Sequence, residues 1–265
     1  MASKSMGPNS TSMQRFADIT GEPRRMLAPI QGYEKMPLVP LEEAVEPIIS
    51  YVPQVQRMVW TVKENCDTPA DGLTIDQSAS IMLYTLEWIP RGDSFYFIFN
   101  KVLRAEDRNK LKPWFLYLRL LITALSKLPP TGPRVIYRGV KEDLHDLYPK
   151  GKKLVWWGFS SCTNSVEVLQ AEDFLGKRGN RTIFNIECHS GRDIHQHSFY
   201  STENEVLLLA ARQFQVISCL DSGNGLHIIQ LKEIEPSFPL LEPIEDDLDK
   251  TATSSSLLSS KPIKR

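Results

Sequence analysis

Three short stretches of the chain place polar or charged side chains beside strand-like apolar residues. They carry Arg138 in the first stretch, Ser161 in the second, and Glu203 with Glu205 in the third. A buried guanidinium, hydroxyl or carboxylate costs free energy unless it meets a polar partner. Side chains of these types are therefore poor candidates for core packing. Together they predict a cleft that binds a polar ligand, which we interpret as a nucleotide.

Each stretch suits one part of such a ligand. The guanidinium of Arg138 can bind a phosphate through two parallel hydrogen bonds, which lysine cannot do. Ser161 leaves a hydroxyl free for a ribose or a carboxylate if Thr163 caps the next turn. Glu203 and Glu205 would point to the same face of an extended chain, where a cationic substrate between them would relieve their repulsion. Taken singly, an exposed arginine, a capped turn and a solvated acidic loop are the commoner explanations.

In this order along the chain, the three stretches resemble the R-S-E signature of the arginine-specific mono-ADP-ribosyltransferases, whose acidic motif is Glu-x-Glu. The resemblance covers roughly residues 37–235. Two further stretches, 32–39 and 218–225, are similar to members of this family from rotifers. The resemblance implies NAD, or NADP in its place, as a substrate of the protein.

The resemblance also implies a role for each residue of the signature. Arg138 would contact the pyrophosphate of NAD, and the backbone of Gly139 would contact the nicotinamide amide. Ser161 would be the signature serine, with Thr163 completing the Ser-x-Thr form of the motif. Glu205 would be the catalytic glutamate.

A second group of residues would engage the acceptor. By the same resemblance, Glu203 would select arginine, and Phe199 and Tyr200 lie in the loop where the family has an aromatic residue that helps to engage the target. The implied activity is transfer of ADP-ribose from NAD to an arginine side chain of a protein, with release of nicotinamide. Two alternatives stay open. One is an NAD glycohydrolase, with water as the acceptor, and the other is a catalytically silent relative that binds NAD or a protein partner.

The composition is that of an ordinary soluble globular protein. The 265 residues are 42% apolar and 24% charged, with a net charge of -1, which gives no field to attract nucleic acid or an anionic membrane. No apolar run is long enough for a transmembrane helix or a secretory signal, so we expect a cytoplasmic protein. His195 and His197 have no cysteine or acidic residue at ligand spacing, so we expect no metal. We also expect a monomer.

A cluster of turn-forming residues, 129–133, divides the chain into a helical part, 41–128, and a strand-rich part, 134–235. Helices followed by strands favour an α+β fold over βαβ units. With the family resemblance, we expect an N-terminal helical subregion followed by a two-sheet, mainly antiparallel ADP-ribosyltransferase core. This places the domain at 31–240, between a flexible leader, 1–30, and a flexible tail, 241–265.

The sequence pattern also predicts the bounds of individual elements. Thr74 and Gln77 form a capping box that predicts the start of one helix. The predicted helices are 41–49 with a break at Pro47, 55–65, 75–88, 95–103 and 114–128. The predicted strands are 134–140, 154–160, 181–188, 205–209, 213–221 and 226–234.

Overall fold

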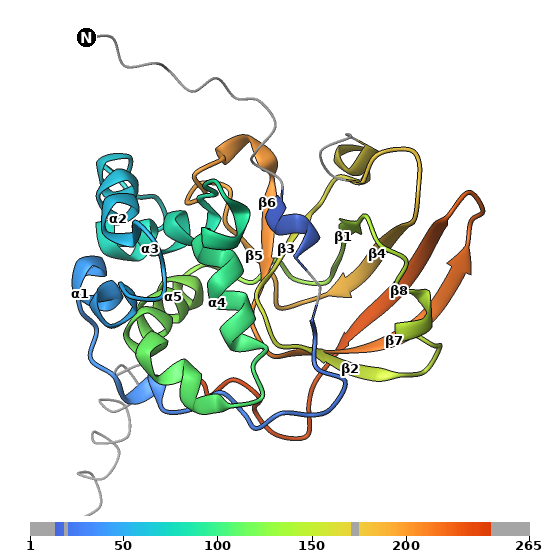
Figure 1. The fold of residues 1–265 in the computed structure, drawn as a ribbon, viewed down its shortest axis with the longest axis horizontal. Coiled ribbons are helices and arrows are strands. Elements are labelled where there is room, and N and C mark those ends of the chain that lie inside the picture. The colour runs from blue at the N-terminus through green and yellow to red at the C-terminus, as the bar shows by residue number, and fades with distance from the viewer. Residues whose placement is uncertain (1–13, 19–20, 171–174, 245–265) are drawn as a thin grey trace, which may run out of the picture.

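The structure, a computed structural model, describes residues 14–18, 21–170 and 175–244. Within these ranges, five α-helices precede eight β-strands, and Figure 1 shows the helices gathered on one side of the strands. The helices are α1 Leu41–Val45, α2 Val55–Glu64, α3 Ile75–Thr85, α4 Phe95–Leu103 and α5 Phe115–Lys127. The strands are β1 Arg134–Val140, β2 Lys153–Trp156, β3 Ser160–Thr163, β4 Arg181–Cys188, β5 Arg192–Asp193, β6 Glu205–Leu208, β7 Arg212–Asp221 and β8 Leu226–Ile234.

The predicted helices are present, and the capping box is confirmed. The side chain of Thr74 accepts a hydrogen bond from the backbone of Gln77, whose side chain accepts one from the backbone of Thr74. The first predicted helix ends at Val45 and continues as a 3-10 helix, Glu46–Ile48, that contains Pro47. No helix within the described ranges is long and apolar enough to cross a bilayer.

An aromatic cluster holds the helices against the strands. Phe95 and Phe99 stand four residues apart in α4 and therefore lie on one face of the helix. The ring of Phe99 stacks on Trp114, with centroids 5.0 Å apart, and on Phe159, at 5.8 Å. Phe159 directly precedes β3, so this cluster fixes the position of that strand relative to α4.

The predicted two-sheet core is wrong, because the strands form one eight-stranded mixed sheet. The strand order is β2-β7-β8-β4-β1-β3-β6-β5. The strands β4 and β8 pair in parallel from Arg181↔Leu226 to Glu187↔Lys232, whereas the other neighbouring strands are antiparallel. This parallel ladder makes the sheet mixed, and it joins β2, β7 and β8 to the other five strands.

The sheet is strongly curved around its own core. Trp156 of β2 and Phe184 of β4 have ring centroids 5.3 Å apart, although β7 and β8 lie between their strands. In a flat sheet three strand spacings would separate them by about 14 Å. Curvature therefore lets side chains from distant strands share one cluster, while a second cluster packs against the helices.

The predicted strand 154–160 is two strands, β2 and β3, separated by residues 157–159. Gly158 lies in this interruption, where a Cβ atom would stand 3.0 Å from Nη2 of Arg104 and 3.1 Å from Oδ1 of Asn100. The chain thus bends to pass close to α4. The short strand β5 was not predicted, because two residues show no periodicity.

We expect the aromatic cluster to carry a large share of the stability. Replacing the fully buried Phe99 with alanine should lower the free energy of unfolding by about 3 to 5 kcal/mol. The change leaves a cavity and removes the ring that stacks on Trp114 and Phe159. Urea denaturation measures this change. Trp60→Ala, at a side chain that is 65% exposed, is the matched control and should shift the value by no more than about 0.5 kcal/mol. A Phe99→Ala protein as stable as that control would contradict the assignment.

Candidate active site

Three neighbouring strands bring the predicted signature residues together. Arg138 lies in β1, Ser161 in β3 and Glu205 at the start of β6, and these strands are adjacent in the order β1-β3-β6. All three residues are fully buried. Nη1 of Arg138 donates a hydrogen bond to the carbonyl oxygen of Ser161, at 3.2 Å. We call Arg138, Ser161, Glu203 and Glu205 the signature site.

The backbone between the two glutamates differs from the predicted extended chain. Glu203 ends a 3-10 helix, Ser201–Glu203, and Asn204 has φ 46° and ψ 47°, in the left-handed region. Asparagine tolerates this region better than most residues do. The turn at Asn204, rather than strand alternation, brings the carboxylates of Glu203 and Glu205 to one place.

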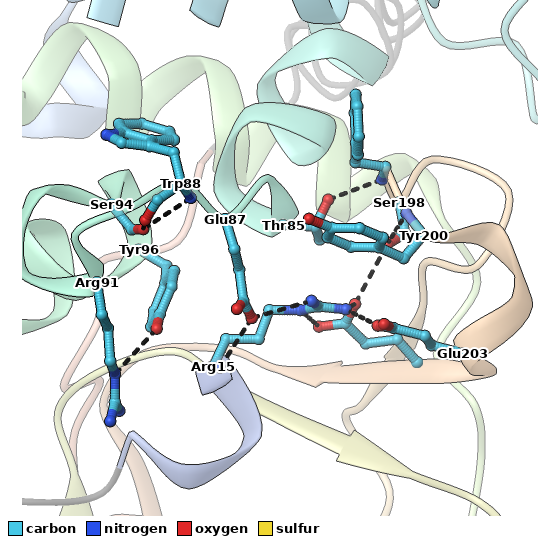
Figure 2. A network of polar contacts seen from close by, with 12 residues as sticks. Arg15, Thr85, Glu87, Trp88, Arg91, Ser94, Tyr96, Ser198, Tyr200 and Glu203 are labelled. Carbon is cyan, nitrogen blue, oxygen red and sulfur yellow. Dashed lines mark hydrogen bonds and ion pairs between the residues drawn. The ribbon is translucent and has the colours of Figure 1, made fainter. Parts of the chain in front are cut away.

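A guanidinium from far along the chain lies between these carboxylates. Figure 2 shows Arg15, from the 3-10 helix Gln14–Ala17, pointing toward Glu87 and Glu203. Its Nε donates to Oε1 of Glu205 at 3.0 Å, and its Nη2 donates to Oε2 of Glu205 at 2.7 Å and to Oε2 of Glu203. Its Nη1 lies 3.3 Å from Oε1 of Glu87, and the ring of Tyr200 lies 5.3 Å from its central carbon. Arg15 is 1% exposed, so all of these contacts are shielded from water.

The neighbouring carboxylates stabilise the positive charge of Arg15. Burial alone would lower the pKa of Arg15, but the carboxylates of Glu205 and Glu203 outweigh burial and raise the pKa above its ordinary value. The guanidinium therefore remains a cation. It supplies the positive charge that two adjacent buried carboxylates require.

The carbonyl oxygen of Asp18, three residues after Arg15, is contacted by two other guanidinium groups. Nη2 of Arg138 donates to the carbonyl oxygen of Asp18 at 2.6 Å, and Nη2 of Arg104 donates to the same oxygen at 2.7 Å. The Asp18 carboxylate accepts bonds from Nη1 of Arg104 at 3.1 Å and from Nδ2 of Asn100 at 2.9 Å. Two cations that share one oxygen make this a suitable site for a phosphate oxygen.

Nε of Arg138 and Oγ of Ser161 are buried polar atoms of the signature site for which the described residues provide no hydrogen-bond partner. An unpaired buried polar group costs about 1 to 3 kcal/mol. A ligand that carries hydroxyl and phosphate oxygens would satisfy both atoms.

The other predicted site residues lie close to the signature site. Oγ1 of Thr163 accepts a bond from the backbone of Ser165, so this side chain caps a turn. Tyr200 is half-buried and faces Arg15, as Figure 2 shows. The backbone of Phe199 donates to Thr85, and the Phe199 ring packs against the helical core. The position of a Cβ on Gly139 would lie 3.3 to 3.4 Å from leucine side chains.

Several residues at the site were not predicted. Asn100 stands out as the single amide in the apolar helix α4, and this contrast was an available signal. Arg104 and Glu87 have the charges of ordinary helix-end residues, and Ser198, which donates to Glu205 at 3.4 Å, resembles any loop serine. Arg15 belongs to the stretch predicted as a flexible leader, where no periodicity marks it.

One group of side chains outside the signature site has metal-binding character. Ligand atoms of Asp143, His145 and His227 lie within 4.8 Å of one another. The Nδ1 atoms of the two histidines lie 2.7 and 3.2 Å from the same Asp143 oxygen, and the rings are stacked 4.4 Å apart. These residues make no contact with the signature site in the described network.

Asn100 positions the chain just before β3, and this assignment can be tested. Its Oδ1 accepts from the backbone of Phe159 at 2.9 Å, and its Nδ2 donates to the Phe159 carbonyl at 3.2 Å. Asn100→Ala should lower the free energy of unfolding by about 2 kcal/mol, because both buried groups lose their partner. Urea denaturation, with the exposed Asn109→Ala as control, measures the difference. Equal stability of the two variants would show that Asn100 is dispensable for this turn.

Comparisons with known proteins match most of the chain to one family. The family model described as NAD:arginine ADP-ribosyltransferase matches residues 38–237. A Mycobacterium avium protein that bears the name of an NAD(+)–arginine ADP-ribosyltransferase is 33% identical over 113 residues, or 42% of this chain. Those residues make up 13% of that protein, so the chain spans only a small part of its length.

Two solved structures share the fold. One is a variant of the eucaryotic mono-ADP-ribosyltransferase ART2.2 in complex with NAD, with 19% identity, coverage of 75% of this chain and 85% of that chain, and a TM-score of 0.54. The other is the ADP-ribosyltransferase Vis of Vibrio splendidus in complex with agmatine, with 22% identity, coverage of 77% and 91%, and a TM-score of 0.50. With the family model covering most of the described residues, the chain belongs to the NAD:arginine ADP-ribosyltransferase family.

Proposed function

We propose that the protein transfers ADP-ribose from NAD to arginine side chains of a protein target and releases nicotinamide. The observation that carries this proposal is the guanidinium held by Glu203 and Glu205. These carboxylates bind an arginine side chain in this very structure, with Tyr200 beside it. An arginine acceptor would find the same ion pairs.

The residues present also fit NAD. Arg138 and Arg104 converge on one oxygen and are suited to the pyrophosphate, and the unpaired Oγ of Ser161 is suited to a ribose hydroxyl. The NAD complex of the ART2.2 variant and the agmatine complex of Vis, each a protein of the same fold, support this pairing of substrates. Bound NAD would supply the ADP-ribose, with nicotinamide as a neutral leaving group.

Glu205 has the position for the first chemical task. Breaking the bond between nicotinamide and ribose leaves positive charge on the sugar, which a nearby carboxylate stabilises. Glu205 is fully buried, and Ser198 donates to its Oε2. A carboxylate shielded from water acts more strongly on a developing charge than one in solvent. We assign Glu205 as the catalytic carboxylate.

Glu203 has the position for the second task. A guanidinium is protonated at physiological pH and becomes a nucleophile only when it loses a proton. Glu203 contacts the terminal nitrogen of Arg15, and so it would orient an acceptor arginine at the same atom. It would accept the proton as the new bond forms. Tyr200 would hold the plane of the guanidinium against its ring.

From the sequence, we propose further that residues 31–240 act as one ADP-ribosyltransferase domain. We also propose that the protein works in the cytoplasm as a monomer, without a metal. Hydrolysis of NAD is the competing activity, and it differs only in the acceptor, because water replaces the guanidinium.

Removing the catalytic carboxylate should abolish cleavage of NAD. Glu205→Gln keeps the shape of the side chain but loses its negative charge, so nicotinamide release at saturating NAD should fall by about 100-fold or more. Chromatographic detection of nicotinamide measures this rate. The exposed Glu64→Gln is the matched control and should match the wild type. Release at the wild-type rate from Glu205→Gln would remove this residue from the mechanism.

Glu203 should separate transfer from hydrolysis. In Glu203→Gln, labelling of agmatine with ADP-ribose should fall by about 100-fold, because no base accepts the guanidinium proton. Nicotinamide release without agmatine should stay within a few-fold of the wild type, since water needs no such selection. Parallel assays of both products test the assignment. If both activities fall together, Glu203 serves cleavage rather than acceptor choice.

A further inference from the structure

We propose that residues 14–18, which we call segment 14–18, are a built-in competitor of NAD. In the closed state of the protein they occupy the signature site, and NAD binds only after they leave. This inference rests on the proposed function, because it takes NAD as the ligand of the signature site.

The first observation is that Arg15 takes both carboxylate oxygens of Glu205. Its Nε and Nη2 lie 3.0 and 2.7 Å from Oε1 and Oε2. The glutamate that would face the ribose is therefore engaged, and it is completely shielded from solvent. A ribose hydroxyl could reach this carboxylate only after Arg15 had moved.

The second observation is that Asp18 takes the groups suited to the pyrophosphate. Its carbonyl oxygen accepts from both Arg138 and Arg104. Its carboxylate accepts from Arg104 and Asn100. The anion site is thus filled by two oxygen-bearing groups of the chain itself.

The third observation concerns Phe16, which is fully buried. Its ring packs with Leu169 and Leu175. The same two leucines lie 3.3 to 3.4 Å from the position of a Cβ on Gly139. Phe16 therefore shares an apolar cluster with the two leucines that lie against the glycine of β1, on the side of the signature site that carries Arg138.

The order of chemical groups along segment 14–18 parallels that of NAD. Arg15 is a cation, Phe16 is an aromatic ring and Asp18 is an anion. The nicotinamide end of NAD combines a positive charge with an aromatic ring, and the pyrophosphate that follows is negative. A peptide with this order satisfies the carboxylates and the guanidinium groups of the site at the same time.

Segment 14–18 can leave without opening the main core. Neither of the two large clusters of buried apolar residues includes any of its side chains, and only Phe16 belongs to the small third cluster. Arg15 and Asp18 are held mainly by polar contacts, which include those of Arg15 with Glu87, Glu203, Glu205 and the Tyr200 ring and those of Asp18 with Arg138, Arg104 and Asn100. NAD and water can replace such contacts, whereas neither replaces a packed core.

The first test compares NAD affinities of full-length proteins by calorimetry. Arg15→Ala removes the contacts with Glu203 and Glu205, so the closed state loses stability and NAD should bind at least about tenfold more tightly than to the wild type. The matched control is Arg25→Ala, an arginine in the same part of the chain whose ion pair with Glu106 is exposed. It should leave the affinity unchanged. Unchanged or weaker binding by Arg15→Ala would overturn the proposal.

A second measurement needs no variant. Hydrogen–deuterium exchange of the wild-type protein should show faster exchange of the amides in segment 14–18 when NAD is saturating, because the segment is displaced. Continued protection with NAD bound would overturn the proposal. If the amides stay protected and peptide mass spectrometry finds ADP-ribose on Arg15, this residue would be an acceptor rather than a competitor.

The two proposals fail in different ways. If Arg15→Ala binds NAD more tightly but transfers no ADP-ribose to agmatine, the proposal that segment 14–18 competes with NAD is supported and the proposed transferase activity is wrong. If transfer occurs and the affinity for NAD does not change, the transferase activity is supported and the proposal of a competing segment is wrong. If neither the wild type nor Arg15→Ala binds NAD, both are wrong.

Discussion

Two buried carboxylates, those of Glu203 and Glu205, lie close enough to contact one nitrogen atom, and the arrangement of the site depends on this pair. Like charges removed from water repel each other unless a cation lies between them. The left-handed turn at Asn204 brings the pair together, and pairing of β6 with β3 keeps Glu205 in place. The site is therefore built to attract a guanidinium, whether that guanidinium comes from the chain itself or from a substrate.

The helical part of the protein does more than cover the sheet. Helix α4 reaches the site through Asn100, which holds both backbone groups of Phe159, and through Arg104, which binds Asp18. Gly158 allows this approach, since a Cβ atom there would stand only 3.0 Å from Nη2 of Arg104 and 3.1 Å from Oδ1 of Asn100. The arginine side of the site thus belongs jointly to β1 and the end of α4, and the carboxylate side belongs to β6 and the 3-10 helix Ser201–Glu203.

Much of the fold could be predicted from the sequence, because periodicity reports which faces are buried. The strands 134–140, 181–188 and 226–234 and the helix 95–103 have the predicted bounds. Periodicity carries no information about which strands pair, and so the parallel β4–β8 ladder and the single sheet were not predicted. The signature residues were predicted because each follows or precedes an apolar run, and the structure brings them together on neighbouring strands. Arg15 was not predicted, because a few strong polar contacts in a stretch without periodicity leave no pattern.

The chain is anchored again only four residues beyond Asp18. Glu22 accepts a bond from Nε of Arg104 at 2.6 Å and from the backbone of Trp157 at 2.9 Å. A group on so short a tether faces its site at an effective concentration on the order of millimolar, whatever the concentration of the protein. Dilution therefore cannot release Arg15. The fraction of protein molecules with NAD in the signature site would therefore depend on the concentration of NAD and not on the concentration of the protein, because the effective concentration of Arg15 at the site stays constant.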